Sequence, residues 1–252
     1  MSVLELQRNI IYGPIQSRRL GRSLGINLLP TTCKACTFDC IYCQYGSVEP
    51  LIGAKEQSGF PEPEIVLRKV REAVSHQPEL DYLTFSGNGE PSLHPRFPEL
   101  VEGVRRLRDR LCPHVRLAVL SNSSQIYRPE IRRAVEQLDA PIMKLDAGDP
   151  VTLAQINRPL SGIRFEEIMA GLRAMPRLLV QTMFVAGPVQ NVEGEAHEAW
   201  LAAIARLSPE TVQIYSLDRP AGAAGVQKVP AQVLQRLART AAERTGIDVK
   251  AY

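Results

Sequence analysis

Four of the five cysteines in this 252-residue chain lie in one short segment, CKACTFDCIYC, at residues 33–43. The last three, Cys36, Cys40 and Cys43, have the spacing C-x3-C-x2-C, and an aromatic residue, Tyr42, immediately precedes the third. Loops this short cannot sensibly be closed by two disulfides, and five is an odd number of thiols. The segment therefore indicates metal binding by thiolates in a reducing compartment.

Two kinds of metal centre suit such a segment. A structural zinc site needs four protein ligands, and all four cysteines of the segment could supply them. Zinc modules, however, usually take two pairs of ligands from different turns and so tie distant segments together. An iron–sulfur cluster with four irons can take three thiolates from one tight loop and leave its fourth iron free. The spacing favours the cluster, with zinc as the alternative.

The rest of the chain alternates runs of strand character with helical patterns. The expected strands are residues 22–29, 80–86, 115–121, 141–146, 178–185 and 211–217, and a helix and a last strand follow in residues 231–252. Apolar residues at helical spacing, such as Phe97, Val101 and Val104, mark the core-facing sides of the helices between them. Six β/α units in series predict parallel strands joined by right-handed crossovers. We therefore predict an α/β fold, a partial (β/α)6 TIM-like barrel forming a single domain over residues 1–252, with barrel strands from about residue 22 to residue 217.

In barrels of this kind, functional residues lie on the loops after the carboxyl ends of the strands. The cysteine-containing loop, residues 30–46, follows the first expected strand. Polar and aromatic residues follow or end the other strands: Gly87, Asn88, Gly89, Glu90, Ser121, Asn122, Lys144, Asp146, Gln181, Met183, Ile214 and Tyr215. We expect these residues at the same face of the barrel as the cysteines.

The C-x3-C-x2-C spacing with Tyr42 resembles the hallmark of radical S-adenosylmethionine (SAM) enzymes. The wider string YGPIQSRRLGRSLGINLLPTTCKACTFDCIYCQYG resembles the branch grouped with the wyosine-base synthases of tRNA, and the similarity continues through FSGNGEPSLHP and VQIYSLDRP. The resemblance implies a [4Fe–4S] cluster held by Cys36, Cys40 and Cys43, whose fourth iron binds the amino and carboxylate groups of SAM. Reductive cleavage of SAM would then yield a 5′-deoxyadenosyl radical that removes a hydrogen atom from a substrate. A fourth thiolate would close the open iron, so Cys33 is expected to be a bystander, and Cys112 a core residue.

The same resemblance implies roles for the residues at the strand ends. GNGEP, residues 87–91, resembles the glycine-rich motif that meets the methionyl amine, whose charge Glu90 would offset. Contacts to the ribose hydroxyls and the carboxylate are expected from Ser121, Asn122, Lys144, Asp146, Gln181 and Met183, and flanking of the adenine from Tyr42, Ile214 and Tyr215. Hydrogen bonding within the barrel and core packing are the alternative roles for these residues. A dinucleotide-binding loop is not indicated, because no third glycine follows Gly87 and Gly89.

Arginines are the candidates for substrate recognition. Arg158 in NRPL and Arg219 in LDRP follow expected strands and precede prolines, so both are predicted to project over the barrel mouth and to act on an anionic substrate. The alternative for both is a solvated surface position. Arg18, Arg19 and Arg22 form a basic patch ahead of the first strand, which would meet an anionic substrate or cap a barrel edge. His94, without an evident partner, is expected to be a turn residue.

Composition bears on location and partners. With 30 basic and 27 acidic residues, the net charge of +3 indicates neither a nucleic-acid nor a membrane partner. No secretion signal and no apolar run of membrane-spanning length is recognised, so a cytoplasmic protein is expected. The resemblance implies an external electron donor of the flavodoxin or ferredoxin type.

The substrate is open at this level. A tRNA base is a candidate, but the wyosine synthases hold a second cluster with three further cysteines, and only Cys33 and Cys112 are unassigned here. A small metabolite, a sugar nucleotide or a peptide is at least equally compatible with the sequence. The alternatives are an activase that installs a radical on a glycyl-radical enzyme and, from another class, a structural metal-binding or electron-carrier protein.

Overall fold

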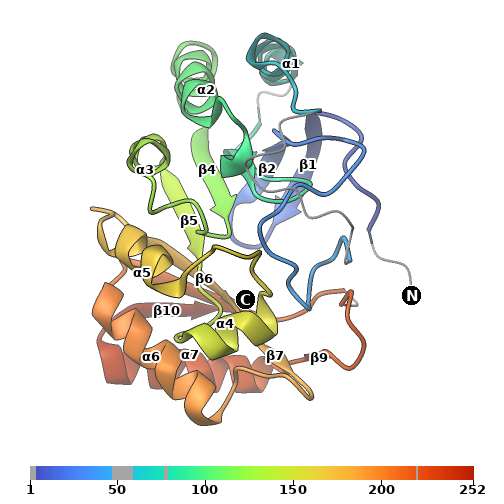
Figure 1. The fold of residues 1–252 in the computed structure, drawn as a ribbon. Helices are drawn as coiled ribbons and strands as arrows, with labels where there is room; N and C mark the ends of the chain where they lie inside the picture. Colours follow the sequence, from blue (N-terminus) through green and yellow to red (C-terminus); the bar gives the residue numbers. More distant parts are fainter. Residues whose placement is uncertain (1–3, 47–58, 77–78, 220) are drawn as a thin grey trace.

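The computed structural model describes residues 4–46, 59–76, 79–219 and 221–252 (Figure 1). One curved sheet of eight strands forms the centre of the molecule, and its spatial order is β1-β2-β3-β4-β5-β6-β8-β10. The strands are β1 (Ile11–Ser17), β2 (Gly21–Ile26), β3 (Tyr82–Phe85), β4 (Arg116–Ser121), β5 (Ala140–Lys144), β6 (Leu179–Met183), β8 (Thr211–Tyr215) and β10 (Asp248–Ala251). From β2 to β10 every neighbouring pair is parallel. Neighbours in sequence are thus neighbours in space, as right-handed β/α units require.

The sheet is an open, partial barrel. Only β1 runs antiparallel, at the edge beside β2. Within the described ranges β1 does not pair with β10, so the barrel is not closed. This arrangement confirms the predicted α/β partial barrel.

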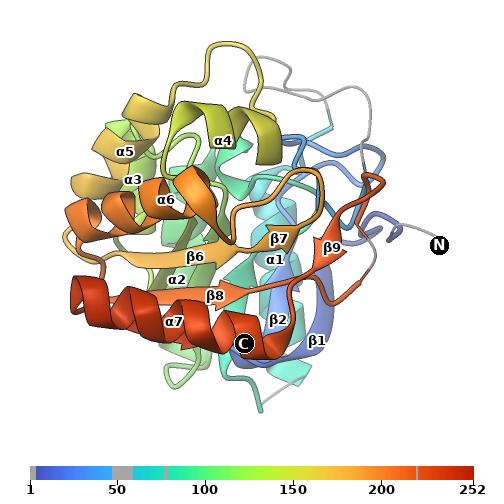
Figure 2. The ribbon, with the colours of Figure 1, turned by 90° about the horizontal axis from the view of Figure 1, so that it is seen from below.

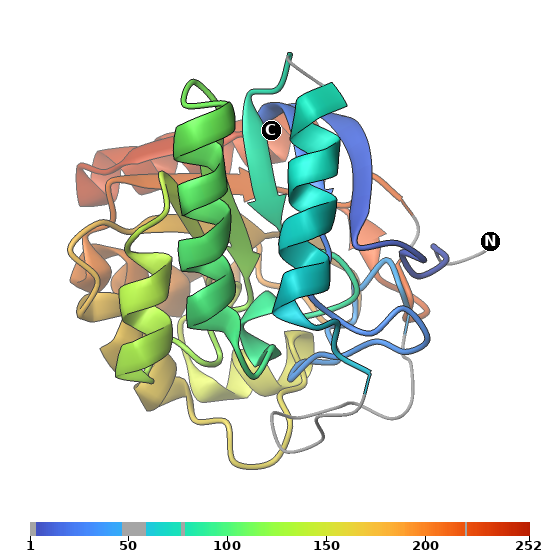
Figure 3. The ribbon, with the colours of Figure 1, turned by 90° about the horizontal axis from the view of Figure 1, so that it is seen from above.

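Helices cover the outside of the sheet. Figure 3 shows α1, α2 and α3 lying side by side over one part of it. Figure 2 shows α6 and α7 beside β6 and β8. The helices are α1 (Pro63–His76), α2 (Phe97–Leu111), α3 (Pro129–Val135), α4 (Pro150–Ile156), α5 (Phe165–Arg173), α6 (Gly194–Leu207) and α7 (Ala231–Thr245). A single 3-10 turn, η1 (Pro91–Leu93), and a small antiparallel pair, β7 (Val185–Ala186) with β9 (Gln227–Lys228), complete the described elements.

The apolar stripes read from the sequence do face the core. In α2, Phe97, Val101 and Val104 are fully buried between the helix and the sheet. Leu111 continues the same helical spacing, but it is the last residue of α2 and is 42% exposed because the chain turns away there. Burial of the apolar faces of successive helices thus provides the stability of the outer layer.

The element boundaries differ from the sequence-based expectation in a few places. The first strand was expected to begin at residue 22, but β1 precedes it and contains Gly13 and Pro14. Its pairing with β2 is irregular between Tyr12 and Ile15, which leaves Pro14 where no ladder hydrogen bond is needed. Among the described strands, β1 pairs with a neighbour on one side only, and its sequence IYGPIQS lacks the regular alternation of apolar and polar residues by which a strand is recognised.

The hairpin turn between β1 and β2 enters the barrel and fills one end of it. Leu20, in this turn, is 7% exposed and packs against Ala118, Ala140 and Ile142 of the central strands. The barrel interior becomes polar on the side of this turn that faces the carboxyl ends of the strands. There, Gln181 of β6 donates a 3.2 Å hydrogen bond to Gln213 of β8. The β1–β2 turn therefore leaves interior space only toward the carboxyl ends of the strands. None of the helices in the described parts of the chain is long and apolar enough to cross a membrane.

Candidate active site

A cavity of about 290 Å3 lies between the cysteine-containing loop and the carboxyl ends of the strands, and we call it the central cavity. Its walls come from the β1–β2 turn, the cysteine loop, the loop after β3, and the ends of β4, β5, β6 and β8. The lining residues are Arg19, Lys34, Cys36, Phe38, Cys40, Tyr42, Cys43, Gln44, Tyr45, Ser86, Gly87, Gly89, Glu90, Leu120, Ser121, Asn122, Lys144, Gln181, Met183 and Tyr215. The structure thus brings together all three motif cysteines and most of the residues predicted at the strand ends.

The three motif thiols are free and face this cavity. Cys36 is buried, while Cys40 and Cys43 are partly exposed. Burial raises the pKa of the Cys36 thiol to about 12 and that of Cys40 to about 11. Both thiols are therefore protonated at neutral pH in the protein alone, and binding of a metal centre would release protons.

The donor set around these thiols suits an iron–sulfur cluster. Amide groups point at the sulfurs, since Asn157 Nδ2 lies 3.4 Å from Cys40 Sγ and Asn122 Nδ2 lies 3.6 Å from Cys36 Sγ. Within the described part of the chain, no three His, Cys, Asp or Glu side chains are grouped so as to hold a single metal ion. Each thiolate of a cubane binds a different iron, so the ligands of a cluster need not converge on one point. Three separated thiols around one cavity fit that geometry.

A buried lysine lies directly beside the cysteines. Lys34 is 1% exposed, donates to the Gly46 carbonyl at 3.1 Å and lies 3.6 Å from a carboxylate oxygen of Asp39. Burial acts to lower the pKa of Lys34, but the negative charge that Cys43 and Cys36 carry as thiolates outweighs it, and the pKa is raised. Lys34 therefore places a positive charge where several thiolates would gather.

The other two cysteines lie away from the central cavity. Cys33 packs beside Leu29, Ala35 and Leu93 in a small apolar cluster. Cys112 ends α2 and is 6% exposed in the main core. Both positions agree with the expectation that these two thiols do not belong to the ligand set.

The glycine-containing loop after β3 is paired directly with the cysteine loop. Ala35 N donates to Asn88 O and Glu90 N donates to Ala35 O, both at 2.9 Å, and Ala35 and Gly89 form a parallel bridge. Gly89 has a φ of 143°, and a Cβ placed on it would overlap the Ala35 carbonyl. Glycine is required here because both the backbone conformation and the close approach exclude a side chain.

Two residues of this loop are held by the chain itself. Asn88 does not line the central cavity, because its amide donates to the carbonyls of Gln7 and Pro30, each at 2.9 Å. Glu90 does line it, yet its carboxylate accepts from Ser92, from Ser121 Oγ at 2.9 Å and from the Asn122 backbone N–H at 2.5 Å. Burial raises the pKa of Glu90, although these donors oppose the shift. Glu90 therefore joins the loop after β3 to the end of β4.

A network of polar side chains crosses the ends of β5, β6 and β8. Asp146, 2% exposed, accepts from Tyr42 Oη, from Asn157 Nδ2 at 2.7 Å and from the Met183 N–H at 2.7 Å. Lys144 Nζ lies 3.1 Å from Asp146 and 3.0 Å from Tyr215 Oη. Asp146 itself does not line the central cavity and supports the residues that do.

Electrostatics keep Lys144 charged. Burial acts to lower the pKa of this lysine, but the Asp146 carboxylate outweighs it, and the pKa is raised above its usual value. Lys144 Nζ also lies 5.0 Å from the Tyr42 ring centre and 5.1 Å from the Tyr215 ring centre. The ammonium is therefore fixed between two aromatic rings at the cavity wall.

Arg158 and Arg219 lie at the surface of the molecule. Both are exposed, and neither lines the central cavity. The Arg158 carbonyl accepts from the Asp39 N–H at 3.1 Å, so its backbone, in a left-handed conformation with φ 45°, supports the cysteine loop. Arg219 lines a surface hollow with Asp218 and Lys228. A proline after an arginine constrains the local backbone but does not determine the direction of the arginine side chain.

Six residues that line the central cavity were not expected there from the sequence: Lys34, Phe38, Gln44, Tyr45, Ser86 and Leu120. Lys34 and Phe38 carried a usable signal, since they lie within the cysteine motif itself. Arg19 also lines the cavity, and it is the one member of the basic patch expected to meet an anionic substrate or cap a barrel edge that does so. His94 is a turn residue, as expected, with Nδ1 accepting from the Arg96 N–H at 3.0 Å.

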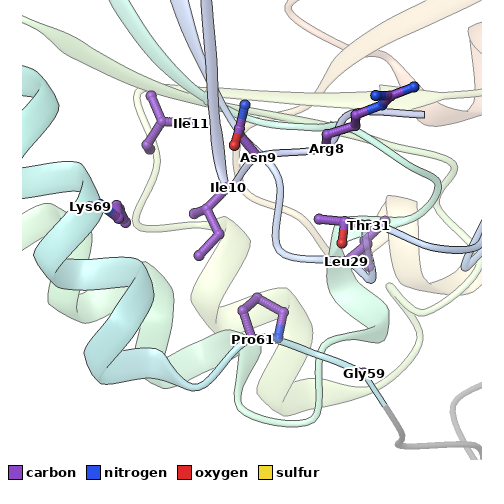
Figure 4. A pocket seen from close by; sticks show the side chains of 9 residues that line it. All are labelled: Arg8, Asn9, Ile10, Ile11, Leu29, Thr31, Gly59, Pro61 and Lys69. Atoms are coloured by element: carbon purple, nitrogen blue, oxygen red, sulfur yellow. The ribbon is translucent and has the colours of Figure 1, made fainter. Parts of the chain in front are cut away.

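A second, larger cavity of about 470 Å3 lies on the outside of the barrel (Figure 4). Its side chains come from the segment before β1, from Leu29 and Thr31, from Pro61 and from Lys69 of α1. It contains no cysteine, histidine or carboxylate among its lining residues. Of these two cavities, only the central cavity contains side chains that could bind a metal centre.

An open parallel barrel with three free thiols at the carboxyl ends of its strands is the arrangement of a class of iron–sulfur enzymes. The family model of the radical SAM superfamily matches residues 31–201, which is more than half of the chain. The protein belongs to the radical SAM superfamily. Members of this superfamily are enzymes that use a [4Fe–4S] cluster and SAM, and they generally need an electron donor.

The chain is also similar in sequence to curated relatives and in fold to solved structures. The chain is 34% identical to UPF0026 protein slr1464 of Synechocystis sp. over 83% of its own length and 76% of that protein. It is 35% identical to UPF0026 protein MJ1312 of Methanocaldococcus jannaschii, but it spans only 56% of that relative. In fold it is similar to TYW1 with a bound lysine-pyruvate adduct, with a TM-score of 0.59 and 15% identity over 88% of this chain and 73% of that one. The enzyme anSMEcpe with bound AdoMet gives a TM-score of 0.62 at 12% identity, over 91% of this chain and 63% of that one.

Proposed function

We propose that this protein cleaves SAM reductively at a [4Fe–4S] cluster in the central cavity and uses the resulting radical to remove a hydrogen atom from a substrate. One observation carries the proposal: three free thiols, a glycine-containing loop and the polar ends of four strands all line the same cavity. The radical SAM superfamily supplies the class of reaction.

Within this proposal, Cys36, Cys40 and Cys43 are the ligands of the cluster. The amides of Asn122 and Asn157 donate to ligand sulfurs and so stabilise the thiolate form. Cys33 takes no part, since its side chain packs in a separate apolar cluster. Three protein ligands leave one iron open, as binding of SAM requires.

The residues for SAM divide into those that contact it and those that position the contacts. Direct contacts are proposed for Tyr42, Gly87, Gly89, Glu90, Ser121, Asn122, Lys144, Gln181, Met183 and Tyr215, all of which line the central cavity. Gly87 and Gly89 allow close approach to their backbone. Asn88 and Asp146 lie behind the lining and are proposed to fix the loop after β3 and the Lys144 ammonium.

When bound, the cluster and SAM supply a 5′-deoxyadenosyl radical after transfer of one electron. The chain's own residues orient the two groups and limit the access of water to them, since most polar groups in the walls are already paired with one another. The electron is proposed to come from an external flavodoxin or ferredoxin. Arg158 and Arg219, which are exposed, are proposed to act at the surface around the mouth and not on the reacting atoms.

The proposal is tested with protein prepared anaerobically and supplied with iron and sulfide. About four irons and four sulfides per chain are expected, on the cluster type that three cysteines imply. Reduction in the presence of SAM should release 5′-deoxyadenosine. The variants Cys36→Ala, Cys40→Ala and Cys43→Ala should each lose the cluster, whereas the matched variant Cys33→Ala should keep it. Retention of the cluster in all four variants, or one zinc per chain in the native protein, would refute the proposal and favour a structural metal protein.

A further inference from the structure

Four charged side chains line the central cavity, and three of them have their charge matched by the chain itself. Lys34 lies beside Asp39 and the motif thiols, and Lys144 is paired with Asp146. The Glu90 carboxylate accepts hydrogen bonds from Ser92, Ser121 and Asn122. The fourth is Arg19, and among the described residues no carboxylate lies within ion-pair distance of its guanidinium.

The backbone of Arg19 is held in a fixed position, although no described residue gives its side chain an acidic partner. It belongs to the β1–β2 turn, where the Ser17 hydroxyl accepts from the backbone N–H groups of Arg19 and Leu20 at 3.2 and 3.1 Å. Leu20 is anchored in the barrel interior, and Arg18 forms an ion pair with Asp218 in the loop after β8. The turn is therefore tied down on both sides of Arg19, so little entropy is lost when the side chain binds a ligand.

The Arg19 guanidinium lies against an aromatic ring. Its central carbon lies 4.4 Å from the centre of the Tyr215 ring, over the face of that ring. This cation–π contact uses none of the N–H donors, and within the described part of the chain the guanidinium donates no hydrogen bond to the protein. Arginine presents these donors as a fork that matches an oxyanion with two parallel hydrogen bonds.

From this geometry we propose that Arg19 binds an oxyanion group of the substrate, a carboxylate or a phosphate, inside the central cavity. This inference rests on the proposed function, because the substrate of that reaction is the ligand concerned. The cysteine loop and Arg19 both line this cavity, so an anchored oxyanion would hold the rest of the substrate beside the cluster and SAM. Arg19, and not Arg158 or Arg219, is then the arginine that selects an anionic substrate.

The test measures anion binding by calorimetry on the full chain with its cluster and SAM bound, at constant ionic strength. The probes are inorganic phosphate, pyrophosphate and malonate, so that phosphate and carboxylate ligands are compared. Arg19→Gln should weaken binding of the preferred probe by roughly 10- to 150-fold, the loss expected for even one hydrogen bond to a charged group. Arg19→Lys keeps the charge but loses the fork, and it should weaken binding less.

Arg22→Gln is the matched control, because Arg22 belongs to the same hairpin but is paired with Glu79 away from the cavity. Unchanged anion binding in this control together with a loss in Arg19→Gln supports the inference. Equal losses in both variants, unchanged binding in Arg19→Gln, or no saturable binding to the native protein would overturn it. Loss of SAM affinity in Arg19→Gln without loss of anion binding would also contradict it, since Arg19 would then serve the SAM carboxylate.

Iron content and the spectroscopic change on SAM addition are measured on the same preparations. If either is absent from the native protein, the proposed function fails. If both are present and anion binding does not depend on Arg19, only the present inference fails. Circular dichroism of each variant shows whether a loss of binding reflects unfolding, and Arg19→Lys provides the folded comparison if Arg19→Gln is unstable.

Discussion

Replacement of Gly89 by alanine tests whether the loop after β3 and the cysteine loop act as one unit. A Cβ at residue 89 would overlap the Ala35 carbonyl, and the φ of 143° disfavours any side chain. The two loops would have to separate, which breaks the hydrogen bonds from Ala35 N to Asn88 O and from Glu90 N to Ala35 O. We expect a substantial loss of folding stability and poor assembly of the cluster.

The magnitude follows from these parts. Backbone strain of this kind costs about 1–3 kcal/mol. The two hydrogen bonds contribute about 0.5–1.5 kcal/mol each. Gly89→Ala should therefore lower the free energy of unfolding by about 2–6 kcal/mol if the contributions add. The value is obtained from urea titration of the protein without its cluster, followed by circular dichroism.

Gly162→Ala is the control for the conformational part of this loss. Gly162 also has a positive φ, 90°, but nothing lies within 4 Å of a Cβ placed there. This variant should lose only the strain and should bind iron as the native protein does. Equal unfolding free energies for the two variants, or a normal iron content in Gly89→Ala, would refute the reasoning that the contact with Ala35 shapes the site.

Three further perturbations test the interior. Asp146→Asn leaves the Lys144 ammonium buried without its partner, so the free energy of unfolding should fall by about 3–5 kcal/mol; an unchanged denaturation midpoint would show that the pair is not needed. Trp200→Ala removes a fully buried ring whose Nε1 donates to Thr182 Oγ1 at 3.0 Å. The free energy of unfolding, measured by heat or urea, should fall by about 3–5 kcal/mol. A smaller fall than in the surface variant Arg206→Ala would contradict the packing described. Burial raises the pKa of Tyr12 from 10.0 to about 12, so its contribution to stability is fully present below pH 10 and is lost as the pH rises toward 12. Tyr12→Phe should therefore show a shallower fall of unfolding free energy over that range, and equal slopes would show that Tyr12 is not the titrating group.

Local sequence was sufficient for much of the site. The C-x3-C-x2-C spacing is a property of one loop, so the predicted ligands could be recognised without knowing the fold. The alternation of strands and helices was equally readable, because each helix shows its buried face in residues such as Phe97, Val101 and Val104. Carboxyl ends of parallel strands meet at one face, and this rule placed Ser121, Lys144 and Tyr215 at one cavity.

Other assignments depended on contacts between distant residues. Asn88 and Asp146 were expected at the cofactor, yet their side chains are taken up by Gln7 and by Tyr42, which are remote in sequence. The edge strand β1 was missed because a strand that pairs on one side, and contains Gly13 and Pro14, shows little of the usual alternation. For Asn88 and Asp146 the decisive partner lies many residues away.

The amino-acid sequence established the metal-binding motif, the superfamily resemblance and the order of β/α units, since all three are encoded in short segments and their periodicity. Which arginine faces the central cavity was settled by folding in three dimensions. Arg158 and Arg219 lie outside, while Arg19 reaches the cavity because the β1–β2 turn enters the barrel and is anchored there by Leu20. Side-chain direction depends on the packing of a whole element against the others, and no local pattern around an arginine records that packing.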